Sequence, residues 1–292
     1  MSDYYIVSDV TLDLPQEVID DLELKIIPMD FHLGDTTYTH YPDERELSCE
    51  KFYEQLKAGA TSVTSQINPV AYENFLEPLL KEGKDILYIA FSSGLSGTYN
   101  TGRMMTEELK EKYPERTIYC IDSLCASIGE GLLVYLAGME KRKGKSIEEV
   151  KDFVLEHKTK CCHWFTVEDL HHLKRGGRLT SLEAMVGTAL KICPVLSVDR
   201  EGKLVVVSKV RGNKKALDYL VKRLEEDGID TKDQTVIVGH SACRSYAETV
   251  ANTLLERGLV KDVIITNIGP VIGTHVGSGM CALTFVGENF KF

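Results

Sequence analysis

The 292-residue sequence predicts a two-domain α/β protein, in which a doubly wound, mostly parallel sheet is followed by an α+β domain. Segments typical of strands and helices alternate through the first 160 residues, which is the pattern of a parallel sheet. Residues 85–93 form a nearly continuous apolar run, as expected of a strand buried on both faces. After Lys160 two apolar runs within 194–212 are joined by a turn at Glu201-Gly202, which indicates an antiparallel pair. We therefore expect domains at 1–160 and 161–292, with a ligand in the cleft between them.

The N-terminal domain is expected to alternate apolar strands with helices that follow polar breaks. The expected strands share apolar or β-branched residues and cover 4–10, 24–34, 85–93 and 117–123. Helices are expected after Pro15, over 49–58, 70–82 and 97–112, and from about 126. Ser146 and Glu149 have the spacing of a capping box, which predicts a helix to about 158.

The C-terminal domain has a different order of elements. Its expected strands are 161–167, the two strands of 194–212, 234–242, a strand from Asp262 and a terminal strand from Cys281. Its expected helices lie on both sides of Gly176-Gly177 and over 213–226 and 243–257. Strands followed by helices in this irregular order favour an α+β domain with an antiparallel pair.

Composition and charge exclude several classes of protein. The 34 basic and 44 acidic side chains give a net charge of −10, which disfavours general nucleic-acid binding. The sequence predicts no integral membrane segment and no secretory signal, so we expect a cytoplasmic protein. None of the eight cysteines forms a C-x-x-C pair, so we expect reduced, buried thiols and neither a metal site nor a cofactor.

Three polar clusters follow expected parallel strands, where ligands gather in doubly wound sheets. They are Ser8-Asp9, the glycine- and hydroxyl-rich segment 92–98, and Asp122-Ser123. The segment 92–98 precedes a helix, whose N-terminal N–H groups and dipole favour an anion. The alternative interpretation is that Ser96 only caps the helix and the glycines only form a turn.

Three further features have both a functional and a structural interpretation. The hydroxyl-rich run 61–66 is either a second set of donors or a solvated loop. His275, among four glycines in 269–279, either donates to an anion or has a structural role. Arg178, after Gly176-Gly177, either binds a carboxylate or phosphate or is a surface arginine.

Known catalytic signatures are missing from the sequence. It contains no G-x-x-x-x-G-K-[ST] motif, no strand-linked G-x-G-x-x-G motif and no G-x-S-x-G nucleophile elbow. An alternative function nevertheless stays open, in which Ser96 and His275 act together in a hydrolase or phosphoryl-transfer enzyme on a polar substrate.

Six motifs in order resemble the DegV family across essentially the whole chain. They are TSQ at 64–66, SSGLSGTYN at 92–100, DSLCASIGEG at 122–131, HLKRGGRL at 172–179, KVRGNKKAL at 209–217 and GPVIGTHVGSG at 269–279. The resemblance implies a protein with no catalysis of its own that binds one long-chain fatty acid, such as palmitate, stearate or oleate, between its domains. The sequence is similar to the subunit that presents the acyl carboxylate to a separate fatty acid kinase. That kinase makes acyl phosphate for phospholipid synthesis.

The resemblance also implies roles for individual residues. Thr64 and Ser96 would hold the carboxylate, with Ser93 close by and His275 ordering the neighbouring hydroxyls. The residues near the head group would be Ser65, Arg178 and Gly277, and Arg211 would lie on the surface that meets the kinase. The sequence departs from the family pattern at Val10, at Ile67-Asn68 and at Ser278.

The fatty-acid tail needs an apolar tunnel. The apolar stretch 182–192 has more hydrophobic surface than one helix face requires, so we expect it to line the tail. Packing in the protein core is an equally good interpretation of this stretch. The residues expected in the tunnel are Met185, Val186, Ala189 and Leu190.

Overall fold

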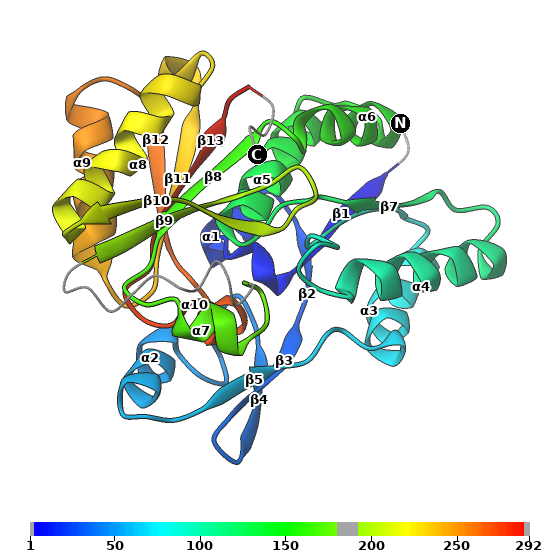
Figure 1. Cartoon of the computed structure of the whole chain (residues 1–292). Helices are drawn as coiled ribbons and strands as arrows, with labels where there is room; N and C mark the ends of the chain where they lie inside the picture. Colours follow the sequence, from blue (N-terminus) through cyan, green and yellow to red (C-terminus); the bar gives the residue numbers. More distant parts are fainter. Residues whose placement is uncertain (1–2, 180–191, 289–292) are drawn as a thin grey trace.

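The computed structural model describes residues 3–179 and 192–288, whose strands form three sheets (Figure 1). The first sheet is parallel and has the order β2-β1-β6-β7. Its strands are β1 (Tyr4–Asp9), β2 (Lys25–Ile27), β6 (Asp85–Ala90) and β7 (Ile118–Asp122). All six residues of β6 are buried, because helices cover both faces of this sheet. The parallel sheet predicted for the N-terminal part is therefore confirmed.

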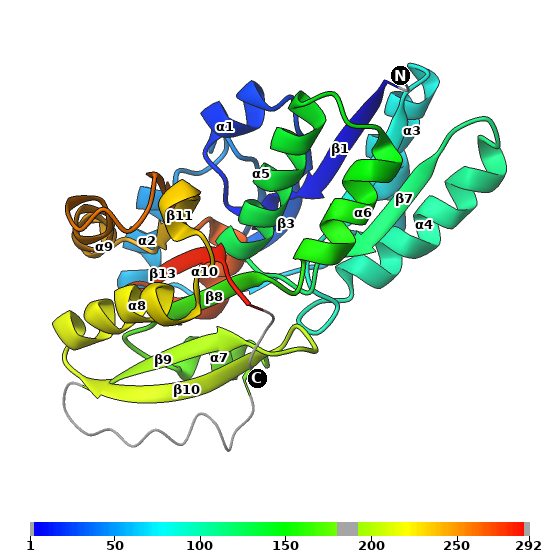
Figure 2. The same ribbon diagram turned by 90° about the horizontal axis from the view of Figure 1, so that it is seen from above.

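The helices of the first sheet lie on opposite faces. One face packs against α3 (Pro69–Lys81) and α4 (Thr98–Lys112). The other packs against α5 (Ile128–Arg142) and α6 (Ile147–His157), as Figure 2 shows from above. Ser146 and Glu149 form the predicted capping box at the start of α6. The short 3-10 helix η1 (Val10–Leu12) and α1 (Gln16–Asp21) connect β1 to β2.

The second sheet is mixed and has the order β10-β9-β8-β13-β11-β12. Its strands are β8 (Cys161–Thr166), β9 (Ile192–Val198), β10 (Leu204–Arg211), β11 (Thr235–His240), β12 (Asp262–Asn267) and β13 (Cys281–Val286). β11 and β12 are parallel, and the other neighbours are antiparallel, including the predicted pair β9 and β10. The outer face is covered by α8 (Asn213–Asp227) and α9 (Arg244–Glu256), and the 3-10 helix η2 (Thr231–Asp233) lies between α8 and β11 in the chain.

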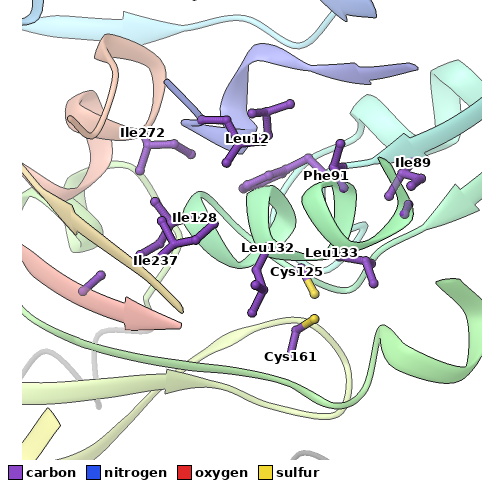
Figure 3. Close-up of a cluster of buried hydrophobic side chains, with 14 of the residues drawn as sticks. Leu12, Ile89, Phe91, Cys125, Ile128, Leu132, Leu133, Cys161, Ile237 and Ile272 are labelled. Atoms are coloured by element: carbon purple, nitrogen blue, oxygen red, sulfur yellow. The ribbon is translucent and has the colours of Figure 1, made fainter. Parts of the chain in front are cut away.

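Helix α5 packs against both large sheets. Its glycines and apolar side chains are buried on most sides, which is typical of a helix inside a core rather than on a surface. In Figure 3, Ile128 and Leu132 lie with Ile237 of β11, while Leu12 and Phe91 belong to the side that faces the first sheet. The two sheets therefore share one hydrophobic core across α5.

A third, small antiparallel sheet corrects two of the expectations from sequence. The expected strand 24–34 is interrupted at Pro28, which has no N–H for a ladder, and gives β2 and β3 (Met29–Leu33) in different sheets. The hydroxyl-rich run 61–66, for which no strand was expected, contains β5 (Ser62–Thr64). The order of this sheet is β4-β3-β5, with β4 at Thr36–His40, and α2 (Cys49–Lys57) packs against it.

The glycine-rich segment 269–279 is also more regular than expected. It contains the helix α10 (Pro270–Val276), with proline in the first turn, where its missing N–H is tolerated. Gly273 of α10 packs closely against Phe52 and Tyr53 of α2. Only glycine allows this approach, because a Cβ at this position would overlap both side chains. The glycines therefore allow a close approach of a helix rather than a flexible loop.

The fold class predicted from the sequence, with a parallel sheet followed by a mixed one, is confirmed. Among the described strands, those of the first and third sheets lie before residue 160, and those of the second lie after it. The domain limits 1–160 and 161–292 stay a proposal, which this separation supports. Within the described ranges there is no helix with the length and apolar character needed to cross a membrane.

Candidate functional site

A cavity of about 200 Å³ extends from the loop before α4 to the inner face of the second sheet. Polar residues gather at one end, where β5, the start of α4, α10 and the segment after α7 (His171–Arg175) meet, and Thr11, Ser127, His163 and Thr284 line the cavity elsewhere. This polar end is formed by Thr64, Ser65, Gln66, Ser96, Gly97, Thr98, Arg178 and His275. Away from it the lining is mainly apolar and includes Met29, Phe91, Leu95, Ile128, Phe165, Leu173, Val198, Leu204, Ile272, Val276 and Met280. A cavity of this kind suits a molecule with a polar head and a long apolar body.

Thr64 and His275 are in direct contact at the polar end. Thr64 is the last residue of β5, and its Oγ1 lies 2.9 Å from His275 Nε2 on α10. Burial, together with the nearby Arg178 and Arg175, lowers the pKa of His275 to about 4. The imidazole is therefore neutral at pH 7. A second contact of 2.6 Å, between Ser62 Oγ and Thr274 Oγ1, ties β5 to α10 beside the first.

Ser96 lies where the loop after β6 enters α4. Its Oγ accepts a hydrogen bond from the Thr98 N–H at 3.2 Å and lies 2.9 Å from Thr98 Oγ1. The N-cap of α4 is Gly97, without a side-chain capping hydrogen bond, so the interpretation of Ser96 as the cap is wrong, and Ser96 lines the cavity. The side chain of Gln66 packs directly on Gly97, where a Cβ would overlap the Gln66 amide oxygen. The N-terminal end of a 15-residue helix thus opens into the polar end of the cavity, which favours an anion there.

Arg178 brings a half-buried positive charge to the same end. Its Nε donates to Leu95 O at 3.2 Å and its Nη1 donates to Gly176 O at 2.5 Å. These hydrogen bonds go to carbonyl oxygens rather than to a carboxylate, so within the described residues the charge is only partly compensated. Desolvation lowers the pKa of the guanidinium, which stays protonated at pH 7.

The structure brings five of the predicted site residues to the cavity, namely Thr64, Ser65, Ser96, Arg178 and His275. Ser93 and Gly277 are outside its lining. Ser93 is exposed, with its backbone N–H donating to Asp122 Oδ1 at 3.1 Å. Gly277 ends α10 with a φ of 71° and packs against the ring of His172.

Arg211 does not line the cavity. It is exposed at the end of β10. The expected tunnel residues Met185, Val186, Ala189 and Leu190 lie outside the described residues. The apolar walls that the structure does describe were not singled out by the sequence analysis, because Phe91, Ile128 and Phe165 have the pattern of ordinary core residues.

Two carboxyl groups are buried directly behind the cavity. Asp9, from the predicted cluster at the end of β1, accepts hydrogen bonds from Phe91 N at 3.2 Å and Tyr88 OH at 3.3 Å, and contacts Thr11 Oγ1. Glu130 of α5 contacts Ser8 Oγ at 3.1 Å and Thr11 Oγ1 at 3.0 Å. Burial raises the pKa of both groups. Phe91 and Thr11 line the cavity, so these acids support its wall without lining it.

The structure does not pair Ser96 with His275 as the enzyme hypothesis requires. His275 Nε2 contacts Thr64, whereas Ser96 Oγ contacts Thr98. A serine nucleophile needs a base within hydrogen-bonding distance of its oxygen. The described contacts therefore favour a binding site over a serine–histidine catalytic pair.

Comparison with known proteins shows similarity over nearly the whole chain. A family model described as "Uncharacterised protein, DegV family" matches residues 4–288. A DegV domain-containing protein of Clostridium perfringens is 42% identical over 288 residues, which cover 99% of each chain. The solved fatty acid binding DegV family protein of Streptococcus agalactiae is 30% identical, with a TM-score of 0.84 over 99% of this chain and 100% of that one. A structure describing fatty acid binding of a DegV family protein from Thermus thermophilus is 26% identical, with a TM-score of 0.88 over 98% of this chain and 99% of that one. As the six motifs predicted, the chain belongs to the DegV family.

Proposed function

We propose that this protein binds one long-chain fatty acid, with the carboxylate at Thr64 and Ser96 and the tail along the apolar part of the cavity. The observation that carries the proposal is the division of the cavity into a polar end with one arginine and an otherwise mainly apolar lining. Lipid binding is what the family's solved members from Streptococcus agalactiae and Thermus thermophilus are described as doing.

The polar end holds the carboxylate through short hydroxyl donors. His275 is neutral, and in the tautomer that carries its proton on Nε2 it donates to Thr64 Oγ1. The hydroxyl proton of Thr64 is then free to point at a carboxylate oxygen, because the histidine has satisfied the oxygen of Thr64. Ser96 supplies a second hydroxyl, and Arg178 supplies a positive charge nearby. Hydrogen bonds to an ionised acceptor are the stronger kind, so this set selects the acid over an uncharged head group.

The tail supplies most of the affinity. A chain of roughly 16 carbons has about 14 methylenes, and burial of each contributes about 0.8 kcal/mol, which gives a ceiling of about 11 kcal/mol. Ordering the tail and the protein reduces that value. Palmitate, stearate and oleate all have an acyl chain long enough to supply this apolar contribution. The residues around the carboxylate determine the orientation in which these acids bind.

We further propose that the bound carboxylate is presented to a separate fatty acid kinase, which makes acyl phosphate for phospholipid synthesis. The protein itself then acts as a carrier and performs no catalysis. The resemblance of the six motifs to the kinase-associated subunit supports this step. Arg211, exposed at the end of β10, is the residue proposed to face the kinase.

Identification of the bound molecule is the direct experiment. We expect native mass spectrometry of the purified protein to show one added mass per chain, and denaturation to release a long-chain fatty acid. An empty protein that also takes up no added oleic acid would contradict the proposal.

Removal of either hydroxyl should weaken binding. We expect Thr64→Val and Ser96→Ala each to lower the affinity for oleic acid about tenfold, because each removes a hydrogen bond to a charged group, worth about 1.5–3 kcal/mol. Titration of delipidated protein by calorimetry measures the change. Thr61→Val is the matched control, since Thr61 is exposed three residues away and does not line the cavity. Unchanged affinity in both site variants would refute the assignment of the carboxylate site.

A further inference from the structure

Asp13 lies where three segments from distant parts of the chain meet. It follows η1, is 6% exposed, and uses both oxygens of its carboxyl group. Oδ2 accepts a hydrogen bond from Ser127 Oγ at 2.6 Å, directly before α5. Oδ1 accepts from the backbone N–H of Gly269 at 2.8 Å, directly before α10. The Asp13 carbonyl oxygen also accepts from Thr266 Oγ1 at 2.8 Å, at the end of β12.

Helix α10 depends on such contacts for its orientation. A helix of seven residues is too short to be stable by itself, so its direction is set by the groups that hold it. Besides the Gly269–Asp13 hydrogen bond, these are the bond from Tyr53 OH to Ile268 O at 2.8 Å and the contact between Thr274 and Ser62. His275 is near the end of this helix, and it contacts Thr64 at the polar end of the cavity.

The backbone on both sides of the Asp13–Ser127 hydrogen bond is held in an unusual conformation. Asp13 has a φ of 51° and Ser127 a φ of 52°, a region that residues other than glycine seldom occupy. Such conformations persist where the surroundings fix them. Ser127 lines the fatty-acid cavity, whereas Asp13 does not. Any effect of Asp13 on a ligand in this cavity is therefore exerted through other residues.

We propose that Asp13 is a positioning residue for the carboxylate end of the cavity: by holding Gly269 and Ser127 together, it sets the direction in which α10 presents His275 to Thr64. This inference depends on the proposed fatty-acid binding. Asp13 lies some 50 residues before Thr64 in the sequence. In this proposal it nevertheless determines the contact that Thr64 of β5 makes with His275 of α10. The carboxyl group is suited to the task because its two oxygens serve two donors at once.

The test compares ligands that differ only in the head group. Delipidated wild-type protein and variants are titrated with oleic acid and with oleyl alcohol, and the ratio of the two affinities measures selection of the carboxylate. We expect Asp13→Ala to lower the affinity for oleic acid about tenfold and to change that for the alcohol less than about twofold, the size expected for one misplaced hydrogen bond to a charged group. A merely structural role would lower both affinities together.

Two further variants make the result specific. Asp13→Asn still offers an oxygen to Gly269, and its amide group donates to Ser127 Oγ, so it should restore the acid-to-alcohol ratio to within about threefold of wild type. Asp13→Glu keeps the carboxyl group but moves it by one methylene, so it should lower the ratio and tests the proposal even where Asp13→Ala does not fold. Asp85→Ala is the matched control, because Asp85 is also a buried aspartate that accepts a backbone N–H bond, at the opposite end of the first sheet.

The outcomes separate this inference from the proposed function. Wild-type protein that binds neither ligand overturns both. Wild-type protein that prefers the acid, together with Asp13→Ala and Asp13→Glu variants that keep the same preference, overturns only the role of Asp13. An equal loss of affinity for acid and alcohol in these variants also overturns it.

Discussion

The variant Glu130→Ala should lower the free energy of unfolding by about 2–4 kcal/mol, the range expected when a buried side chain is removed together with its hydrogen bonds. Glu130 is 0% exposed in the middle of the shared core and contacts the hydroxyls of Ser8 and Thr11. Each hydroxyl has a single proton and another acceptor, Ile89 O for Ser8 and Asp9 for Thr11. One proton on Glu130 and one on Asp9 make these contacts compatible, because Glu130 can then donate to Ser8 and Asp9 to Thr11, which agrees with the raised pKa of both carboxyl groups.

Glu130→Gln tests this protonated state. An amide has nearly the shape of a neutral carboxylic acid and can donate in its place, so we expect a loss below about 1 kcal/mol. Glu148→Ala on the neighbouring helix α6 is the control, because Glu148 is exposed and its removal should cost less than about 1 kcal/mol. Urea denaturation of the three variants measures the differences. A loss in Glu130→Gln as large as that in Glu130→Ala would show that Glu130 is ionised.

The second large effect is a dependence of stability on pH that comes from Asp13. Burial raises the pKa of Asp13 from 3.8 to about 7, in spite of its hydrogen bonds with Ser127 and Gly269. Because the folded state holds this proton more tightly, the contribution of Asp13 to stability is complete below pH 4. It is then lost as the pH rises to about 7, by at most about 1.4 kcal/mol for each pH unit. We therefore expect Asp13→Asn to become more stable relative to wild type as the pH increases from 5 to 7.

Wild type and Asp13→Asn must be compared with each other, because other buried groups also change the stability of the protein between pH 5 and pH 7. Asp9 and Glu130 also have raised pKa values and give the same sign as Asp13. His40 and His275 have pKa values lowered by burial to about 3 and about 4, so they destabilise the folded state as the pH falls below 6.5. These contributions are largely common to both proteins, so the difference between their urea midpoints isolates Asp13. A difference that does not change between pH 5 and pH 7 would refute the raised pKa.

The sequence predicted elements well where one signal dominated. The apolar run of β6 predicted a buried strand, and the spacing of Ser146 and Glu149 predicted a capping box. Both are local signals, and both features are present in the structure. The third sheet was missed because Pro28 divides an apolar segment whose two parts pair with different partners. Helix α10 was missed because its glycines reduce helix propensity, and the packing against Phe52 and Tyr53 that favours it involves residues far away in the sequence.

At the polar end of the cavity, too, the sequence predicted residue types but not the contacts between residues far apart in the chain. Hydroxyls before helices and a histidine among glycines predicted the kind of ligand, since those residue types suit a carboxylate. The contact between Thr64 and His275 joins residues 211 positions apart, so no local pattern could place them together. The role of Asp13 has no local signal either, since its two partners, Ser127 and Gly269, follow 114 and 256 positions later.

The position of β13 has a consequence for synthesis of the chain on the ribosome. The last of the described strands in chain order, β13 (Cys281–Val286), pairs on one side with β8 and on the other with β11, in the middle of the second sheet. Until it emerges, β8 and β11 lack their common neighbour, and α5 lacks part of the surface that covers it. The nascent chain must therefore keep part of an apolar helix uncovered from the end of α5 at Arg142 until β13 begins at Cys281.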